Sequence, residues 1–473
     1  MTHMPEVPGK SQEMQITEPT RREFLAGVLG AVTHAPRPAD FGTSLTLVPP
    51  PPVTDRILLD IRAAVRNQSG RTQSFQVAIY LDNEQPHNLL HREKLKVPAH
   101  GAKGILARWP TKGRAGKHTV LLKATSGRQS ISQTAQIEIL ASAAPSTCRI
   151  EGSWISFNLP ESRDSKHYDA DLARMTDDQW KELVRGMAEV GMNVIVIQET
   201  VHNYIHVGEH NMERDGYLGK AFYPSRQHLK RMPMQAADPV EAVFAEADRL
   251  GLNVFQGVGV YAWFDFTPAS LTWHKELASE LWSMYGHHPS FYGWYVGEEV
   301  CGQLACMAKP NPQLETKRHE EIVEFFREFQ AHCRSLAPDK PVMLASNSFW
   351  VARAINIYPS LLAHCDILAP FGFHRMPVGD MTGEEAASML QELCDQAGAR
   401  LWLDLEVFDF DKGGALIPRS IEGITSDLKR YPSFEKILCY QYPGLMSAPW
   451  ASIHPGGPQA VKLFGDYKAF LSR

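Results

Sequence analysis

From residue 149 onward, short apolar runs alternate with longer amphipathic segments, and this alternation restricts the fold more than any other feature. Eight runs have the length and composition of buried strands, at residues 149–158, 193–198, 253–261, 291–296, 342–346, 366–371, 400–406 and 436–442. Helical segments lie between them, and the clearest are residues 315–335, 383–397 and 459–471. Eight βα units in succession predict a (β/α)₈ TIM barrel over residues 148–473.

Two helix starts carry recognisable signals. Thr176 precedes two aspartates as an N-cap, and Asp238-Pro239 places a proline at the first helical position. A doubly wound open sheet is the alternative fold, and it usually carries a glycine-rich phosphate turn after its first strand. The first strand here runs instead into Ser156-Phe157-Asn158-Leu159-Pro160, which favours the barrel.

Residues 41–142 have a different texture. Apolar residues alternate with polar ones in short runs separated by turn residues, as in Ile57, Leu59 and Ile61 or in Val77 and Ile79. This spacing predicts an antiparallel β-sandwich. The segment resembles the immunoglobulin-like modules that precede secreted carbohydrate enzymes, and we expect it to act as a spacer or to pack on the barrel, with sugar binding as the alternative.

Residues 1–40 are expected to be a leader rather than part of a folded domain. Thr20-Arg21-Arg22-Glu23-Phe24-Leu25 is followed by a short apolar run ending at Val32, which resembles a twin-arginine export signal. Ala35 offers a cleavage position, but Pro36 disfavours it. The pattern predicts a periplasmic or extracellular protein, and a chance Arg-Arg pair beside a short helix is the alternative. No apolar stretch reaches the length of a membrane span.

Charge and cysteine content exclude several classes of protein. The formal net charge is −5 without a long basic run, so we expect neither a nucleic-acid partner nor an anionic membrane surface. The 7 cysteines are scattered and form neither a disulfide framework nor a metal knuckle. They are expected to be mostly buried thiols, with a Cys301–Cys306 disulfide as an alternative. No cofactor and no metal is expected.

Active sites of such barrels lie at the carboxyl ends of the strands. Glu299 and Glu406 follow otherwise apolar strands, where an unpaired charge would be unfavourable, so they are the catalytic candidates. A structural ion pair with Arg375 is the alternative. Amides and aromatic rings suit sugar hydroxyls and sugar faces, and the substrate-binding candidates are Trp154, Gln198, Tyr204, Tyr261, Trp263, Tyr295, Asn347, His374, Asp404, Tyr440 and Gln441.

The motif around the fourth strand is specific. Gly293-Trp294-Tyr295 with Glu299 four residues later resembles the barrel family catalogued as domain of unknown function 4434. The resemblance covers residues 148–445 and continues in Gly191-Met192-Asn193, in Tyr285 to Ser290 and in Leu401 to Glu406. It implies a glycoside-hydrolase-like barrel with Glu299 as acid/base and Glu406 as nucleophile.

Two positions depart from that family's pattern. Phe371 and Gly372 follow Pro370 where Gln-Asp is common, so a polar substrate contact is missing or replaced by His374. Glu298 lies beside Glu299, and because adjacent strand residues face opposite sides, only one of the two can point into the pocket. The spacing of the motif selects Glu299.

These features predict a retaining glycosidase acting on an oligo- or polysaccharide, with its two carboxyl groups about 5–5.5 Å apart rather than the about 6.5–9.5 Å of inverting enzymes. Glu299 should have a raised pKa, and Glu406 should be held ionised by hydrogen bonds from Tyr440 or Asn347.

Three alternatives remain open at this point. One is a carbohydrate-binding barrel without catalysis. Another is a metal-dependent hydrolase that uses His202, His206 and His210, which recur every four residues beside Glu209. The third is a surface protein that holds a partner through an exposed apolar patch. The sugar, its linkage and the mode of cleavage are not encoded in any motif found here.

Overall fold

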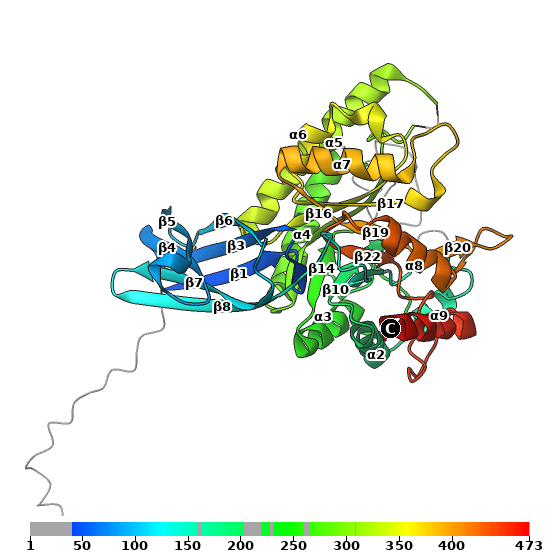
Figure 1. Cartoon of the computed structure of the whole chain (residues 1–473), viewed down its shortest axis with the longest axis horizontal. Coiled ribbons are helices and arrows are strands. Elements are labelled where there is room, and N and C mark those ends of the chain that lie inside the picture. Colours follow the sequence, from blue (N-terminus) through cyan, green and yellow to red (C-terminus); the bar gives the residue numbers. More distant parts are fainter. Residues whose placement is uncertain are drawn as a thin grey trace, which may run out of the picture. The chain divides into compact units, whose positions relative to one another are not determined.

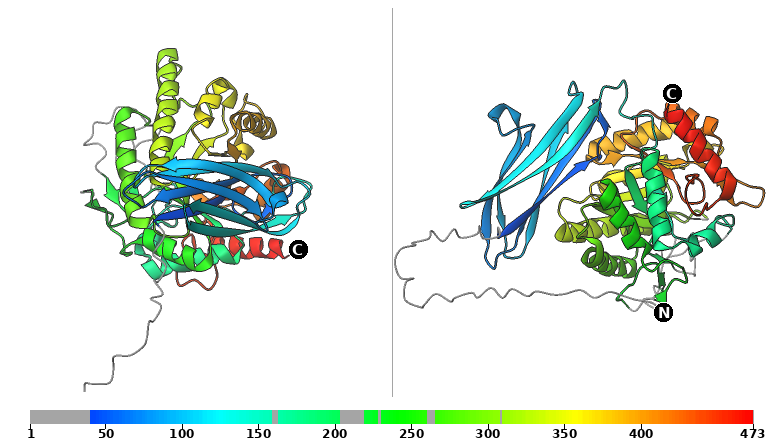
Figure 2. Two further views of the ribbon diagram at one scale, coloured as in Figure 1. Left: turned by 90° about the vertical axis from the view of Figure 1, so that its left-hand side faces the viewer. Right: turned by 90° about the horizontal axis from the view of Figure 1, so that it is seen from below.

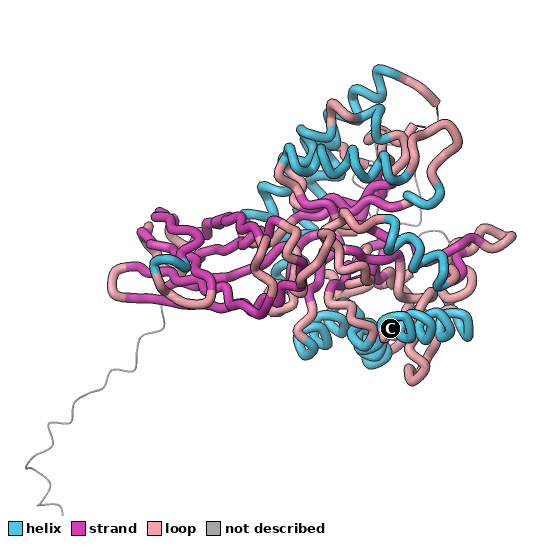
Figure 3. The backbone as a smooth tube through the Cα atoms, viewed as in Figure 1, coloured by secondary structure: helices cyan, strands magenta, loops and turns pink. Residues whose placement is uncertain are grey.

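The computed structural model describes residues 40–158, 163–202, 219–227, 230–259, 265–307 and 309–472. The twin-arginine pattern therefore lies outside the described residues. Strands make up the first part, apart from a short 3₁₀ helix at Pro86–Asn88, and strands alternating with helices make up the rest, as Figures 1 and 3 show. In the part of the chain that the structure describes, no helix is both long enough and apolar enough to cross a membrane.

The N-terminal strands form the expected sandwich, which Figure 2 shows as two layers. One sheet has three antiparallel strands, in the order β1 (Phe41–Val48), β3 (Leu58–Asn67) and β6 (Ala102–Pro110). The other has five, in the order β2 (Val53–Thr54), β8 (Gln129–Leu140), β7 (Gly116–Ser126), β4 (Gln73–Leu81) and β5 (Leu89–Val97). The sheets are antiparallel except that β2 runs parallel to β8.

The barrel consists of parallel strands in chain order, and the eight predicted units are confirmed. They are β9 (Gly152–Ile155), β10 (Val194–Ile197), β14 (Asn253–Gly257), β15 (Phe291–Val300), β16 (Val342–Asn347), β17 (Ile367–Phe371), β18 (Arg400–Leu401) with β19 (Leu403–Glu406), and β22 (Ile437–Tyr440). β18 and β19 are two halves of the seventh strand. The amide of Trp402, between them, donates to the carbonyl of Leu368 at 2.9 Å, so the seventh strand joins both neighbours and the barrel closes.

Helices follow the strands and surround them (Figure 1). They are α1 (Asp169–Arg174), α2 (Asp177–Glu189), α3 (Pro239–Leu250), α4 (Pro268–Tyr285), α5 (Pro312–Leu336), α6 (Tyr358–Leu362), α7 (Gly383–Ala397), α8 (Ile421–Arg430) and α9 (Gly457–Leu471). The predicted N-caps are confirmed: Thr176 forms a capping box with Gln179, and Asp238 accepts from the amide of Glu241.

Short strands lie in the loops at the carboxyl ends of the barrel strands. β11 (Val201–His202), β12 (Lys220–Ala221) and β13 (Lys230–Arg231) form a small sheet after β10. β20 (Phe408–Phe410) and β21 (Leu416–Pro418) form an antiparallel hairpin after the seventh strand. This hairpin borders the site described below.

The third barrel strand is shorter than predicted. It ends at Gly257, where a Cβ atom would lie 2.1 Å from the carbonyl oxygen of Ile197 on the neighbouring strand. Gly259 then turns the chain with a φ of +82°. Residues 260–264, which the sequence assigned to the end of this strand and its loop, lie outside the described residues.

The sandwich closes the amino-terminal end of the barrel. Val48 packs with Trp154, Tyr292 and other inward-facing barrel residues, and the hydroxyl of Tyr292 donates to the carbonyl of Leu47 at 2.6 Å. β3 is buried on both faces for this reason: its apolar residues fill the sandwich, while Asp60 and Arg62 meet the barrel. Both domains accordingly belong to one compact unit, residues 40–473.

Candidate active site

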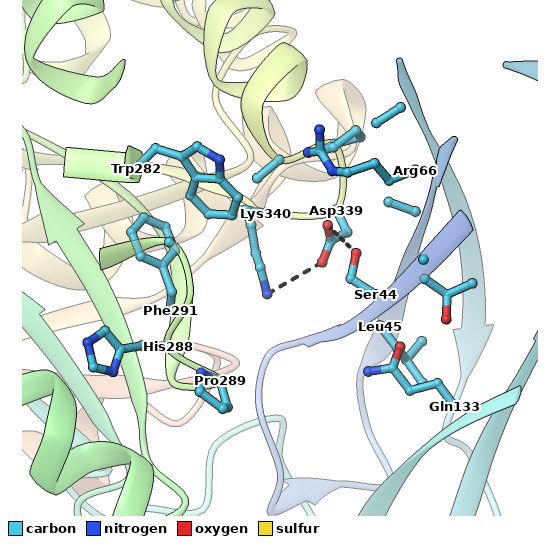
Figure 4. Close-up of a pocket in the computed structure, with 17 residues that line it drawn as sticks. Ser44, Leu45, Arg66, Gln133, Trp282, His288, Pro289, Phe291, Asp339 and Lys340 are labelled. Atoms are coloured by element: carbon cyan, nitrogen blue, oxygen red, sulfur yellow. Dashed lines mark hydrogen bonds and ion pairs between the residues drawn. The ribbon is translucent and has the colours of Figure 1, made fainter. Parts of the chain in front are cut away.

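Two cavities need to be distinguished before a site is chosen. One, of about 360 Å³, lies at the junction of sandwich and barrel and is shown in Figure 4. Its barrel residues precede or begin strands, and its charged groups are already paired, with Asp339 accepting from Ser44 at 2.7 Å and lying 3.4 Å from Lys340. The amino-terminal end of such a barrel serves stability, so this cavity is not the candidate active site.

The second cavity, of about 320 Å³, lies at the carboxyl ends of the barrel strands. Glu299 from the fourth strand and Glu406 from the seventh both line it. The closed strand order places these two strands on opposite sides of the barrel. The structure thus brings both predicted catalytic residues to one cavity.

Strand alternation separates Glu299 from Glu298, as the sequence indicated. Tyr295, Gly297 and Glu299 line the cavity. Glu298 is fully buried on the other side of the strand, where its Oε1 lies 3.9 Å from Nε2 of His274. Burial lowers the pKa of His274 to about 4, so this histidine is neutral at physiological pH.

Glu406 is almost fully buried, and two basic side chains from the loop after the sixth strand contact its carboxylate. Arg375 donates to Oε1 through Nε at 2.9 Å and through a terminal nitrogen at 2.5 Å, and Nδ1 of His374 lies 3.0 Å from Oε2. Burial would raise the pKa of Glu406, but the contacts with His374 and Arg375 outweigh it and hold that pKa below its ordinary value. The sequence had assigned this task to Tyr440 or Asn347, which was wrong.

Glu406 has other partners than the predicted ones because of the backbone conformation at the end of β17. Gly372 adopts a φ of +88°, and residues 373–375 form one turn of 3₁₀ helix. The turn carries His374 and Arg375 back toward the seventh strand. The ion pair that the sequence weighed as a structural alternative is therefore present, but it joins a cavity-lining carboxylate.

Asp404 is a third carboxyl group in the cavity, two residues before Glu406 on the same strand face. Its side chain is buried, and Oδ1 has no hydrogen-bond partner. Burial, together with the negative charges of Glu406 and Glu299, raises the pKa of Asp404 well above its ordinary value. Because the side chain is buried and Oδ1 lacks a donor, the charged form of Asp404 is disfavoured in this cavity.

Aromatic and amide groups form the floor of the cavity. Trp154 and Tyr295 pack edge to face with ring centroids 5.9 Å apart. The hydroxyl of Tyr440 donates to Oε1 of Gln198 at 2.9 Å. All four residues line the cavity, so four more of the predicted contacts are brought together with Asp404 and the two glutamates.

Three predicted residues do not line the cavity and instead support its walls. Oδ1 of Asn347 accepts from the amides of Gly302 and Phe349, at 2.9 and 3.0 Å. Gln441 is buried and accepts from the amide of Ser156 at 3.2 Å. His374 acts on Glu406 as described above.

The remaining predicted residues cannot be placed. Tyr204, Tyr261 and Trp263 lie outside the described residues, as do His206 and His210 and the side chain of His202. The substrate contacts predicted for the three aromatic residues remain predictions, and the metal-dependent alternative that uses the three histidines remains an alternative.

Other cavity residues were missed by the sequence reasoning. Phe371 is the last residue of the sixth strand, and the others come from loops after the first and seventh strands; they are Arg163, Asp164, Phe408, Phe410 and Leu416. Phe408 and Phe410 flank Asp409 directly after the seventh strand, so alternation beyond Glu406 could have identified them. Arg163 and Asp164 carry no signal of this kind.

A further buried acidic residue, Glu199, follows the second strand. Glu199 is fully buried and accepts from the hydroxyl of Ser156 at 2.7 Å. Burial raises its pKa to about 8, so it is predominantly protonated at neutral pH. Glu199 is not among the residues that line the cavity.

Within the described residues, one group has the spacing of metal ligands: Glu241, His287 and His288. It lies next to the start of the fourth strand, at the amino-terminal end of the barrel. Both ring nitrogens of His288 are already engaged, Nδ1 with Asp248 at 2.7 Å and Nε2 with Glu241 at 3.1 Å. This histidine bridges two acidic side chains, and the group lies away from the carboxylate cavity.

Comparison with known families agrees with the motif around the fourth strand. The model of the family described as Domain of unknown function (DUF4434) matches residues 150–452. The chain belongs to this family. The match spans all eight barrel strands and ends before α9. No curated protein matches the chain.

Several solved structures match the chain at low sequence identity. A candidate α-L-fucosidase from Bacteroides thetaiotaomicron is 15% identical, with a TM-score of 0.47, covering 68% of this chain and 93% of its own. A Bacteroides uniformis β-glucuronidase is 12% identical, with a TM-score of 0.40, and the match covers 86% of this chain but 46% of the enzyme. A GH2 β-galacturonidase from Eisenbergiella tayi is 11% identical, with a TM-score of 0.39 and coverages of 92% and 71%.

Proposed function

We propose that this protein is a retaining glycoside hydrolase that acts on an oligo- or polysaccharide, with Glu406 as nucleophile and Glu299 as acid/base. One observation carries the proposal: two glutamates from opposite strands face a single cavity, and one of them is held ionised by an arginine. Cleavage of a glycosidic bond needs this division between a proton donor and an ionised carboxylate.

Glu406 fits the nucleophile because it must be charged at the start of the reaction. Arg375 and His374 both contact its carboxylate, and they keep its pKa low despite burial. In the first step an oxygen of Glu406 bonds to the anomeric carbon, while the bond from that carbon to the leaving oxygen breaks and Glu299 gives its proton to that oxygen. In the second step water attacks the same carbon and Glu299 takes a proton from that water. The bond between the carbon and Glu406 then breaks.

Glu299 suits the acid better than Asp404 does, although burial and the neighbouring carboxylates favour the protonated form of Asp404. The acid and the nucleophile must flank the glycosidic bond. Asp404 stands beside Glu406 on one strand, whereas Glu299 projects from a strand across the barrel. We assign Asp404 as a neutral hydrogen-bond donor to a sugar hydroxyl, since its carboxyl group is buried and Oδ1 is unpartnered.

The floor of the cavity supports the same proposal. Trp154 and Tyr295 offer ring surfaces, and Gln198 with Tyr440 offers polar groups already oriented by their mutual hydrogen bond. A sugar presents both an apolar face and a rim of hydroxyls, so it can use both kinds of group.

Hydrolysis of a panel of glycosyl fluorides and oligosaccharides tests the proposal. Glu406→Gln should lower kcat by at least about 1,000-fold and leave the circular dichroism spectrum unchanged. Glu299→Gln should lower hydrolysis of oligosaccharides more than that of glycosyl fluorides, whose leaving group needs no proton. Asp409→Asn is the matched control, since Asp409 is an exposed carboxylate on the adjoining hairpin that does not line the cavity.

The stereochemistry provides an independent readout. Proton NMR of the first-formed product should show the anomeric configuration of the substrate, and a 2-deoxy-2-fluoro glycosyl fluoride should label Glu406 covalently. Inversion would refute the double displacement, and wild-type rates in Glu406→Gln would refute the assignment altogether. Sugar binding without turnover by the wild type would identify a carbohydrate-binding barrel instead.

We also propose that the protein is exported. The twin-arginine pattern at Arg21-Arg22 is one support. The other is a disulfide between Cys301 and Cys306, since disulfides persist in oxidising compartments and are rare in the cytosol. Replacing both arginines by lysine should retain the protein inside a bacterial host, and unchanged export would contradict the proposal.

A further inference from the structure

The hairpin after the seventh strand places an exposed aromatic ring at the rim of the carboxylate cavity. β20 and β21 pair in antiparallel register, with Phe410 opposite Leu416. Phe410 is 53% exposed and yet lines the cavity. It therefore belongs both to the solvent-facing surface and to the site.

This ring is held in place rather than carried on a free loop tip. Oδ1 of Asp411 accepts from the amides of Gly413 and Ala415 at 2.7 and 2.9 Å, and Oδ2 lies 2.9 Å from Nε2 of His167. The contact with His167, with the two amide bonds, lowers the pKa of Asp411 to about 2, so the carboxylate stays ionised. The amide of Leu416 also donates to the carbonyl of Asp164 at 2.9 Å. Both sides of the turn at the tip of the hairpin are thus tied to the first βα loop.

Phe410 is the outermost of three rings that lead into the cavity. Its centroid lies 5.4 Å from that of Phe408, edge to face, and Phe408 lies 6.1 Å from Tyr440. Phe408 is buried, and Tyr440 is part of the floor. The aromatic surface is therefore continuous from the solvent to the catalytic carboxylates.

The size of the cavity decides what the outer ring can meet. At about 320 Å³ the cavity lies at the small end of ligand pockets, which span about 300–1,000 Å³. A chain of several sugars exceeds this volume, so its outer units must pass over the rim. The ring of Phe410 lines that rim.

We propose that Phe410 forms a second sugar-binding position, which stacks on the apolar face of the sugar unit next to the one held at the carboxylates. The inference rests on the proposed function and adds to it: the substrate is an oligo- or polysaccharide chain bound in at least two units, and the outer unit is held by stacking. Stacking tolerates different sugars, since it needs an apolar face and no fixed pattern of hydroxyls.

Exposure alone would not support this inference, because single apolar side chains are common on protein surfaces. Trp450 shows the difference. It is 47% exposed, but its ring nitrogen is bonded to Glu189 and it does not line the cavity. Position beside the carboxylates, and not exposure, sets Phe410 apart, and Trp450 supplies a matched control.

The experiment compares a substrate that reaches the rim with one that does not. The probes are the β-1,4-linked tetrasaccharides of glucose, mannose, xylose and galactose, together with the glycosyl fluoride of each sugar, whose leaving group is too small to stack. Phe410→Ala should lower kcat/KM for a hydrolysed tetrasaccharide by about 10-fold, mainly through KM, and leave the fluoride unchanged. Phe410→Trp should restore the wild-type value, and Trp450→Ala should change neither.

Equal losses on both substrates, no loss on the tetrasaccharide, or a similar loss in Trp450→Ala would overturn the inference. If the wild type hydrolyses no probe, the proposed function fails by itself, and calorimetric binding of the tetrasaccharides then decides the inference. Binding that weakens about 10-fold in Phe410→Ala would support it, and equal binding or no binding by the wild type would overturn it.

Discussion

The junction between sandwich and barrel contains a buried charge network whose disruption should destabilise the whole protein. Asp366, at the start of the sixth strand, accepts from Arg62 of the sandwich at 2.9 Å, from Arg334 at 3.2 Å, and from the amide of Val342 at 2.9 Å. Asp60 of the sandwich contacts both Arg62 and Arg400. Asp60, Arg62, Asp366 and Arg400 are all buried. The perturbation we consider is Asp366→Asn, which keeps the shape and removes the charge.

The expected magnitude follows from what the substitution leaves behind. In the variant, Asp60 is the acidic partner that remains for Arg62, and Asp60 also contacts Arg400, which is bonded to Glu435 as well. Removing one member of a buried ion pair costs about 3–5 kcal/mol, because the remaining charge is left uncompensated. Arg62 keeps one partner, and Arg334 is half exposed and can turn to water, so we expect the lower end, about 3 kcal/mol.

Urea unfolding of wild type and variant at neutral pH, followed by circular dichroism, measures this loss. A second variant, Arg62→Met with Asp366→Leu, should lose less, since it removes both charges and leaves Asp60 paired with Arg400. The matched control is Glu324→Gln, which breaks an exposed pair with Arg327 and should leave the midpoint unchanged. A loss below about 1 kcal/mol in Asp366→Asn would refute the reasoning.

The pH dependence supplies a further check on the cause. Burial would raise the pKa of Asp366, but Arg62 and Arg334 outweigh it and lower that pKa in the folded protein. A carboxylate with a depressed folded pKa contributes its stability above the unfolded value, about 3.9 for aspartate, and loses it as the pH falls through the folded value. The difference between wild type and Asp366→Asn should therefore be complete at neutral pH and shrink below about pH 4.

Three further predictions concern the site and the junction. Arg375→Met should raise the pKa of Glu406, so the acidic limb of the pH profile of kcat/KM should move to higher pH. Activity at pH 5 should then fall by about 100-fold. An acidic limb that does not move would show that Arg375 does not hold Glu406 ionised. Burial raises the pKa of Asp404, so in the wild type sugar binding should weaken as the pH rises through that pKa, while Asp404→Asn should keep neutral-pH activity within about 10-fold and lack this weakening; the same weakening in the variant would contradict the assignment of Asp404 as a neutral donor. Tyr292→Phe should lower the free energy of unfolding in urea by about 1–3 kcal/mol, since it strands the buried carbonyl of Leu47, and an unchanged value would contradict this.

The sequence predicted the barrel because its strands are buried on both faces and read as plain apolar runs. The helix predicted at residues 383–397 has those bounds in the structure, since a capping box at Thr382 and a left-handed Gly398 mark its ends. Three sandwich strands were missed, and one of them is the two-residue strand β2. β6 carries an exposed Leu106 between buried Ile105 and Ala107, which blurs its alternation. β1 has only a weak period of two, because part of it packs on the barrel rather than meeting water.

The site was predictable as far as strand position decides it. Glu299, Glu406 and Asp404 follow from counting along strands whose alternation is fixed. The partner of Glu406 did not follow, because it depends on the turn at Gly372 that brings Arg375 back over the seventh strand. Contacts made through loops depend on backbone angles that residue types leave open.

The sixth and seventh barrel strands connect the buried charge network at the junction to the carboxylate cavity. The seventh strand begins at Arg400, bonded to Asp60 of the sandwich, and ends at Glu406. At about 3.3 Å per residue these ends lie about 20 Å apart, with no flexible link between them. The sixth strand likewise runs from beside Asp366 to the turn that carries Arg375. A displacement of about 1 Å between a nucleophile and its substrate can lower a rate about 100-fold, so for the proposed hydrolase we predict that the sandwich influences the rate by fixing both strands at their far ends. An Asp366→Asn protein that stays folded but turns over slowly would show this coupling directly.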